Sequence, residues 1–311
     1  MKKAFLIGII FTFYCLLPTI YSFAKGEGGD ALAFLKIGVG ARPLALGKAF
    51  VAVADSANAC YWNPAGLTQV EKPELTFMYS QPYLVELSDV NVSGISYHTI
   101  SAALPFGANV IGTNIIYLGI TDIPEYDVDI KGDPVDKHNT FGDTEMAVLA
   151  SYARKINNLI SLGCNIKGVY QQIYSSSYKD TGFGLDIGAL LKPIVNLKIG
   201  IALHDLVAPT VKLDNEEDKP PLRFQLGVAY LPTHDLLIAI STRSISDRSL
   251  NAYLGLEYQL ISNIAVRGGY STDNEEISGG IGFRHKNLQV DLGLSSHALG
   301  GTPRASLTLR F

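Results

Sequence analysis

The sequence has little charge and few cysteines for its length. Only 17% of its 311 residues are Asp, Glu, Lys or Arg, whereas soluble domains average roughly 25%. The three cysteines exclude a disulfide scaffold and a cysteine-rich zinc module. A net charge of −4 and a pI near 5.9 give no excess of cations, which argues against electrostatic binding of nucleic acid. With 47% apolar residues, the chain is also not a disordered one.

Glycine and aromatic residues are abundant instead, with 30 Gly, 16 Tyr and 13 Phe. This composition favours many strands and turns, and the length suits one large β domain or two smaller ones. Residues 99–121 carry no charge and have the length of a membrane helix. Because Pro105, Gly107, Asn109 and Asn114 interrupt this run, we expect a hairpin there with its turn at 105–108.

The first 24 residues have the features of a secretory signal peptide. Lys2 and Lys3 precede an uncharged apolar run over 4–21, and Ser22-Phe23-Ala24 provides a small-x-small cleavage site. The alternative is a retained anchor, because a run of this length can just span a bilayer. We favour cleavage after Ala24, which places the mature protein outside the cytoplasm.

From residue 72 onward, apolar residues alternate with polar residues or glycine. In the last segment residues 305, 307, 309 and 311 are apolar, and the three residues between them are polar. Alternation with period two predicts strands that have one apolar face. We predict fourteen such strands, at 72–81, 91–104, 109–120, 142–154, 159–174, 181–191, 196–204, 221–231, 235–243, 249–260, 263–271, 277–285, 288–296 and 303–311. Alternation is poor in the second and third of them.

The lengths of the connections between these strands follow a pattern. Short connections of two to four residues alternate with longer ones of five to 21 residues, so the two kinds lie at opposite ends of an up-and-down sheet. Outer-membrane barrels have this asymmetry, together with an even strand number, a lipid-facing apolar face and a polar lumen. Closure of the barrel removes the unpaired edges that lipid cannot satisfy. We therefore predict an all-β fold, a 14-stranded antiparallel up-and-down transmembrane β-barrel over 72–311, in the outer membrane with both termini periplasmic.

Residues 25–71 show too little alternation for strands. Glycines at 26, 28, 29, 38, 40 and 47 interrupt any long element, and 31–35 and 45–54 have the composition of short helices. A segment of this length before a barrel can fill its lumen. We predict an N-terminal plug, which we call the hatch.

Three motifs in the hatch resemble those of a known family. They are Gly38-Val-Gly-Ala-Arg-Pro-Leu-Ala-Leu-Gly47, Ala49-Phe-Val-Ala-Val-Ala-Asp55 and Tyr61-Trp-Asn-Pro-Ala-Gly-Leu67. In this order they resemble the N-terminal signature of the PorV/PorQ-like outer-membrane β-barrels of the FadL superfamily. The Asn63-Pro64-Ala65 core is shared with FadL-type transporters of hydrophobic compounds. The resemblance implies a fourteen-stranded barrel with a hatch, although Arg42-Pro43-Leu44 and Lys48 stand where the family has small residues.

Asn63, Pro64, Ala65 and Gly66 are the candidate gating residues. Proline fixes φ, asparagine can bond the backbone two residues on, and glycine permits a conformation closed to other residues. In FadL transporters the hatch and a neighbouring kink in the wall are thought to open a lateral route for apolar ligands. The resemblance implies that these four residues open such a route here. The alternative is that they only hold the plug in place. The terminal Phe311 resembles the C-terminal signal that the barrel-assembly machinery reads.

No enzyme, cofactor or metal site is predicted. The segment 127–138 resembles a calcium loop, but Lys131 stands where an oxygen ligand is needed. Ser295 and His297 share a strand face, and a surface histidine explains this pair better than an acyl hydrolase does.

Two functions from different classes remain open. The first is a PorV/PorQ-like scaffold, associated with type IX secretion, that binds exported proteins or secretion components through the long acidic loops 121–141 and 205–220. The second is a FadL-like channel for uptake of hydrophobic small molecules, although no long apolar loop is visible to capture them. The hatch signature favours the scaffold. In both cases the partners include outer-membrane lipid and the barrel-assembly machinery, and exclude nucleic acid.

Overall fold

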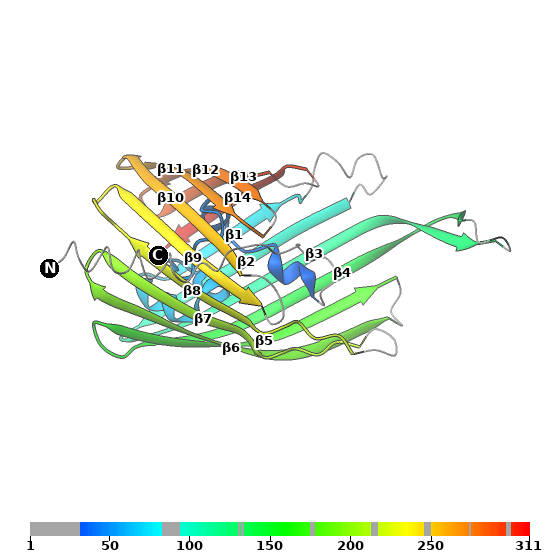
Figure 1. Ribbon diagram of the computed structural model, residues 1–311, viewed down its shortest axis with the longest axis horizontal. Coiled ribbons are helices and arrows are strands. Elements are labelled where there is room, and N and C mark those ends of the chain that lie inside the picture. The colour runs from blue at the N-terminus through cyan, green and yellow to red at the C-terminus, as the bar shows by residue number, and fades with distance from the viewer. Residues whose placement is uncertain are drawn as a thin grey trace.

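The computed structural model describes residues 32–82, 94–129, 131, 134–174, 178–212, 217–245, 250–273, 275–296 and 300–311. Fourteen antiparallel strands form a closed barrel, in which each strand pairs with its neighbours along the chain and β1 pairs with β14 (Figure 1). The predicted fold class is therefore confirmed. The predicted signal peptide lies outside the described residues. No helix in the described ranges is long and apolar enough to cross a membrane.

Among the described residues, four short helical segments precede the strands. They are η2 (Ala33–Lys36), α2 (Ala41–Ala45), α3 (Ala59–Trp62) and η3 (Pro64–Gln69). The strands are β1 (Glu74–Ser80), β2 (Gly94–Phe106), β3 (Asn109–Val128), β4 (Pro134–Lys155), β5 (Ile160–Ile173), β6 (Lys179–Ile194), β7 (Leu197–Val207), β8 (Arg223–Tyr230), β9 (Leu236–Ile245), β10 (Asn251–Ile261), β11 (Ile264–Ser271), β12 (Glu276–His285), β13 (Leu288–Ser295) and β14 (Thr302–Arg310).

Side chains alternate along the strands between the lumen and the outer surface. On β14, Arg304, Ser306 and Thr308 are buried inside, whereas Leu307 is exposed outside. Large apolar side chains cover the outside of the barrel, among them Phe77, Ile100, Leu104, Ile111, Val148, Leu162, Ile166, Phe183, Ile240, Leu256, Ile281 and Leu292. This division is the one that a lipid-facing wall and a polar lumen require.

The short turns and the C-terminus lie at the same end of the barrel. Gly107, with φ +64°, and Ala108 form the turn that joins Phe106 to Asn109, so the uncharged run 99–121 is a hairpin, as predicted. Phe311 is exposed, and its N–H donates to the Pro73 carbonyl at 3.0 Å beside the start of β1. The N-terminus expected after cleavage at Ala24 lies outside the described residues.

The hairpin β3–β4 projects beyond the other strands (Figure 1). Its two strands pair as far as Val128 and Pro134, whereas β2 stops pairing with β3 at Thr121 and β5 stops pairing with β4 at Asp143. The prediction of a loop over 121–141 is therefore wrong. Beyond the wall neither face of a strand needs to be apolar, so the alternation ends although the backbone pairing continues.

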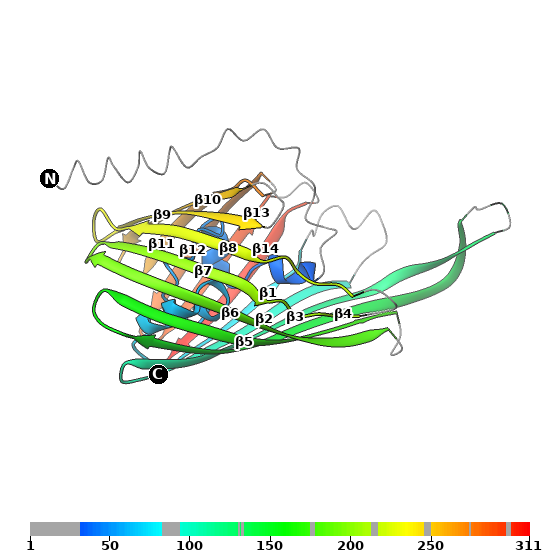
Figure 2. The same ribbon diagram turned by 60° about the horizontal axis from the view of Figure 1, so that its bottom comes forward.

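The hatch lies inside the ring of strands (Figure 2). Most of its residues between Leu32 and Val70 are buried, and they form a single hydrophobic cluster with inward side chains of the barrel. The helix expected over 45–54 is not formed, because α2 ends at Ala45 and three residues in the segment that follows, Gly47, Lys48 and Ala54, have positive φ. Left-handed residues break the hydrogen-bond ladder of a helix.

Candidate functional site

The hatch packs directly against the backbone of the wall, because the wall presents glycine to it. A Cβ at Gly200 of β7 would lie 2.1 Å from the Val51 carbonyl oxygen, and one at Gly269 of β11 would lie 2.1 Å from the Gly47 nitrogen. We call the inward glycines that touch the hatch the glycine belt: Gly112, Gly163, Gly188, Gly200, Gly227, Gly255, Gly269, Gly280 and Gly293. Because these glycines lie on most of the strands around the barrel, their missing side chains leave room for the hatch around most of the lumen.

Several members of the glycine belt face each other across neighbouring strands. Gly163 pairs with Gly188, Gly200 with Gly227, Gly255 with Gly269, and Gly280 with Gly293, as the registers of these strand pairs show. Glycine in a strand marks a place where another backbone approaches closely. These pairs explain why the polar face of the predicted strands so often carries glycine.

Asn63 fixes the hatch against one part of this belt. Its Oδ1 accepts from the Ala65 N–H at 3.1 Å, and its Nδ2 donates to the carbonyls of Val51 at 2.8 Å and Ala189 at 3.1 Å. The first of these is the bond to the backbone two residues on that the sequence predicts, and the last connects the hatch to β6. Asn63 is fully buried. Pro64 starts η3 directly after it.

Gly66 is required for a different reason from the one predicted. Its φ is not in the left-handed region, but a Cβ there would lie 2.3 Å from the Ala54 carbonyl oxygen. Close approach of two hatch segments, rather than backbone freedom, therefore excludes a side chain at this position. Ala65, which is also fully buried, is next to the wall: its nitrogen would lie 2.5 Å from a Cβ at Gly163.

Arg42 anchors the hatch by charge, although the family resemblance led us to expect a small residue there. Its guanidinium contacts Asp55 of the hatch at 2.5 Å and Glu257 of β10 at 2.7 Å. Burial alone would raise the pKa of Asp55, but the Arg42 charge holds that pKa below its usual value. Arg267 of β11 also pairs with Glu257, at 2.5 Å. These groups lie near a polar cavity of about 120 Å³ at the β8–β9 turn.

Lys48, the second departure from the expected pattern, anchors the hatch nearer to the long connections. Its Nζ lies 3.4 Å from Asp273 and 3.0 Å from Glu276, at the β11–β12 connection. Arg243 pairs with the same Asp273 at 3.0 Å. Both departures thus place a cation, half-buried at Arg42 and buried at Lys48, against carboxylates of the wall formed by β10–β12.

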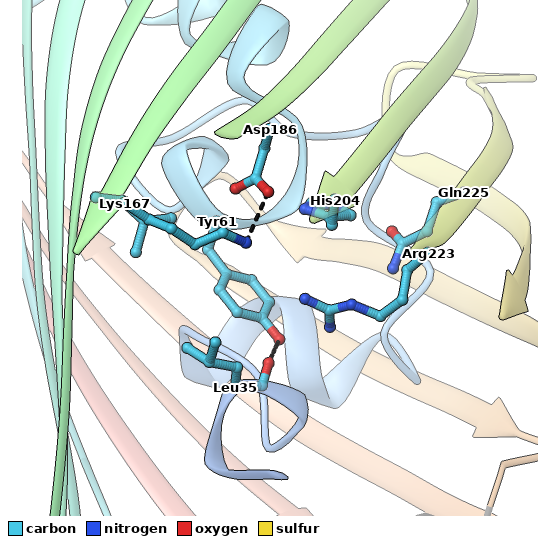
Figure 3. A pocket seen from close by; sticks show the side chains of 8 residues that line it. Leu35, Tyr61, Lys167, Asp186, His204, Arg223 and Gln225 are labelled. Carbon is cyan, nitrogen blue, oxygen red and sulfur yellow. Dashed lines mark hydrogen bonds and ion pairs between the residues drawn. The ribbon is translucent and has the colours of Figure 1, made fainter. Parts of the chain in front are cut away.

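A further group of charges lies where β7 bulges (Figure 3). Lys167 pairs with Asp186 at 2.7 Å and Asp205 at 2.5 Å, and Arg223 pairs with Asp205 at 2.8 Å. Asp205 has φ +61°, in a stretch where two extra residues of β7 oppose β6. Tyr61 of the hatch reaches toward these charges and donates to the Leu35 carbonyl.

The cavity enclosed by this group is only about 10 Å³, room for about one water molecule. Because each charge is matched by an opposite one, the group neutralises itself. We assign this group to holding the hatch in place around Leu35 and Tyr61 rather than to binding a ligand.

One sector of the lumen carries large apolar side chains among its polar ones. Apolar side chains occupy three adjacent cross-strand rows on the inward faces of β2–β5. Tyr97 is opposite Leu118 in the first row, Ala147 lies between Ile116 and Val169 in the second, and Leu149 lies in the third. These buried side chains belong to one hydrophobic cluster with Leu32, Phe34 and Leu35 of the hatch. We call this sector the apolar wall. The inward apolar residues of β2 and β3 account for the poor alternation over 91–104 and 109–120, although Thr99, Ser101 and Asn114 on the same inward faces are polar.

Other candidates from the sequence do not form a site. The described residues contain no group of three or more His, Cys, Asp or Glu that could hold a metal ion. Lys131 N–H donates to Asp129 at the tip of the β3–β4 hairpin. Ser295 bonds to Arg304, and His297 lies outside the described residues. Cys60 and Cys164 are both free thiols.

No family model and no curated protein matches the sequence, but solved structures resemble the fold. They include the toluene transporter TbuX of Ralstonia pickettii, at 13% identity and TM-score 0.63, covering 88% of this chain and 98% of that one. The P. putida toluene transporter TodX is similar at 11% identity and TM-score 0.66, covering 88% and 99%. A Pseudomonas aeruginosa FadL homologue is similar at 13% identity and TM-score 0.60, covering 88% and 98%.

At these identities the likeness establishes the fold, a FadL-like barrel of fourteen strands. The FadL part of the resemblance drawn from the sequence is therefore supported at the level of fold. The finer assignment to the PorV/PorQ branch has no matching family model behind it.

Proposed function

We propose that this protein is an outer-membrane channel for hydrophobic small molecules, the second of the two functions expected from the sequence. The apolar wall is the observation that carries the proposal. Barrels that conduct polar solutes have a polar interior, whereas the inward side chains Ile116, Leu118, Leu149 and Val169 offer a surface on which an apolar molecule can replace the hatch. The structurally similar proteins described as toluene transporters support the same conclusion.

The hatch is the gate in this proposal. Its segment Ala41–Lys48 is held to β10–β12 by ion pairs, whereas Asn63–Gly66 is held to β5 and β6 by hydrogen bonds and close contacts with glycine. Separating neutral contacts costs less free energy than separating ion pairs that are largely shielded from water. We therefore infer that Asn63, Pro64, Ala65 and Gly66 form the part that moves while the segment around Arg42 stays in place.

The secretion scaffold has weaker support. One of the two acidic loops on which it depends, 121–141, is part of the paired β3–β4 hairpin. The other, 205–220, begins in the last three residues of β7 and continues as a connection that an isolated bridge between Val211 and Asp218 closes, with 213–216 outside the described residues. No structurally similar protein described above is a secretion component, so transport of hydrophobic compounds is the better-supported function.

Substituting Ile116→Asn tests the apolar wall. Ile116 is fully buried on the inward face of β3. An amide at this position would lose its hydrogen bonds to water whenever an apolar ligand packed against it. Since an unpaired polar group in an apolar site costs about 1–3 kcal/mol, toluene uptake into cells that express the variant is expected to fall about tenfold or more. Uptake of radiolabelled toluene measures this directly.

The matched control is Ile115→Asn, one residue earlier on the outer face of the same strand. It introduces the same amide without touching the lumen, and uptake should stay within about twofold of the parent. Equal uptake by the parent, by the Ile116→Asn variant and by cells without the protein would show that the channel proposal is wrong. Heat-modifiable migration in gels confirms that each variant has formed a barrel.

A further inference from the structure

Three lysines face inward at the end of the barrel where the short turns lie, which is the periplasmic end in barrels of this class. Lys155 is the last residue of β4, Lys192 lies near the end of β6, and Lys198 is the second residue of β7. Each is two residues away from a buried inward position of its strand, and side chains two residues apart share a face. We call these three residues the lysine row.

The lysine row has no ion pair and no side-chain hydrogen bond with any described residue of the chain. Lys192 and Lys198 are half-buried, and Lys155 is exposed. The charges of Lys198 and Lys155 act on Lys192 and repel it. Asp55 and Glu71 attract Lys192, but neither forms an ion pair with it. The row is therefore a concentration of positive charge that the described part of the chain leaves unpaired.

The arginines of the hatch and of β11 and β14 at the same end are matched, in contrast to the lysines. Arg42 pairs with Asp55 and Glu257, Arg267 with Glu257 and Asp291, and Arg310 with Glu74. The carboxylates of these pairs are therefore engaged elsewhere. Repulsion between neighbouring cations costs free energy, and an external anion that pairs with them offsets this cost.

The polar cavity at the β8–β9 turn keeps one end of the lysine row open. Lys198 lines this cavity of about 120 Å³, which has room for several water molecules. Of the carboxylates that also line it, Asp55 and Glu257 are engaged by Arg42, and Asp235 is exposed on the turn. The Lys198 side chain is therefore hydrated and accessible from the periplasm instead of being covered by the hatch.

The dimensions of the lysine row favour an extended partner. β4 and β7 are three strand spacings apart, which is about 14 Å. Phosphate or a single carboxylate is too small to contact the whole row, whereas an extended peptide, rising about 3.3 Å per residue, covers it with about five residues. A phospholipid surface does not fit, because the row faces the lumen and not the lipid. Acidic side chains on an extended peptide supply several anions in sequence.

We propose that the lysine row docks an acidic segment of a periplasmic protein at the mouth of the barrel. The carboxylates of the segment pair with Lys155, Lys192 and Lys198. Because η3 packs against β4, β5 and β6, the bound segment lies beside the part of the hatch that opens in the proposed function. The proposal goes beyond that function and does not depend on which compound the channel carries.

The test measures binding of a fluorescein-labelled pentaglutamate peptide to the whole barrel in a non-ionic detergent by fluorescence anisotropy. Pentaglutamate should bind at low salt, and its affinity should fall about tenfold or more when NaCl is raised from about 50 mM to about 500 mM, because salt screens accessible charges. Pentalysine and pentaglutamine peptides with the same label should not bind.

Variants locate the binding on the barrel. Changing all three residues of the lysine row to Gln should weaken pentaglutamate about tenfold or more. The matched control removes the same net charge from exposed positions at the opposite end, by Lys131→Gln, Lys179→Gln and Lys219→Gln, and should leave the affinity within about twofold. Reversing the charge with Lys192→Glu and Lys198→Glu should abolish pentaglutamate binding and allow pentalysine to bind. Heat-modifiable migration shows that each variant is folded.

Three results would overturn the proposal. The first is that pentaglutamate does not bind the parent at low salt, and the second is that both triple variants bind it equally well. The third is that inorganic pyrophosphate displaces pentaglutamate with an affinity equal to that of the peptide, since this would identify a site for a small anion. None of these results bears on the channel, which uptake of toluene tests separately.

Discussion

The double substitution Gly200→Val and Gly269→Val is expected to convert a plugged barrel into an open pore. Gly200 lies on β7 and Gly269 on β11. A Cβ at either position would lie 2.1 Å from a backbone atom of the hatch. Backbone cannot rotate away as a side chain can, and overpacking of this kind costs about 1–3 kcal/mol per site. The hatch should leave its seat and expose a lumen lined by charged and polar side chains. Ion conductance in planar bilayers should rise about tenfold or more.

The matched control uses two other glycines, Gly268 and Gly279. They face each other on β11 and β12, and a Cβ meets nothing within 4 Å at the first and no atom closer than 3.7 Å at the second. Gly268→Val with Gly279→Val adds the same volume and the same strand propensity without touching the hatch. Conductance equal to the parent is expected. If both double variants gave the same conductance, the glycine belt would not be what holds the hatch.

Asn63→Ala is expected to make the hatch open much more often. The substitution removes an acceptor from the Ala65 N–H and a donor from two buried carbonyls, those of Val51 and Ala189. At about 1 kcal/mol for each hydrogen bond, the free energy of opening this segment falls by about 2–3 kcal/mol, which raises the population of open hatch about 30- to 150-fold.

The Cys60 thiol reports that opening. It is fully buried in the hatch, and burial raises its pKa to about 12, so it reacts slowly while the hatch is closed. With Cys164 replaced by alanine, a maleimide labels Cys60 at a rate set by the population of open hatch. The labelling rate of the Asn63→Ala variant should therefore rise about 30- to 150-fold. Pro64→Ala, which loses only preorganisation of η3, should raise it about threefold.

Asn157→Ala is the control for this experiment. Asn157 accepts two backbone N–H bonds at 2.8 Å, from Leu159 and Ile160, in the short turn between β4 and β5. The loss in hydrogen bonding is similar but lies outside the hatch, so Cys60 labelling should not change. Labelling of the Asn63→Ala variant at the parental rate would mean that Asn63 neither holds nor gates the plug.

Several features of the site could be predicted from the sequence because their cause is local. The bond from Ala65 N–H to Asn63 Oδ1 spans two residues, and the Asn-Pro dipeptide predicts such a turn. The role of Arg42 could not be predicted, since its partner Glu257 lies 215 positions away. The requirement for Gly66 was attributed to φ, but it comes from Ala54, twelve residues earlier in the chain and brought near by folding.

The apolar wall shows how the absence of a pattern can itself be a signal. Poor alternation over 91–104 and 109–120 reduces the precision of strand prediction. It arises because Tyr97 and Ile116 point inward while neighbouring residues such as Ile100 and Tyr117 point outward, so that apolar side chains occur on both faces. A strand with two apolar faces in a barrel with a polar lumen marks a place where something apolar lies inside. In this structure that is the hatch, and in the proposed function it is also the ligand.

The number of strands, the closed barrel and the opposite ends for short and long connections could all be predicted from the sequence. These follow from the period of a strand and from the difference between lipid and lumen, which act on neighbouring residues and leave a pattern in the chain. How the hatch packs against the wall, and which cations pair with which carboxylates, follow instead from the tertiary structure. Those outcomes depend on which strands lie side by side across the barrel, and closure of the sheet brings together residues whose spacing in the sequence carries no sign of their contact.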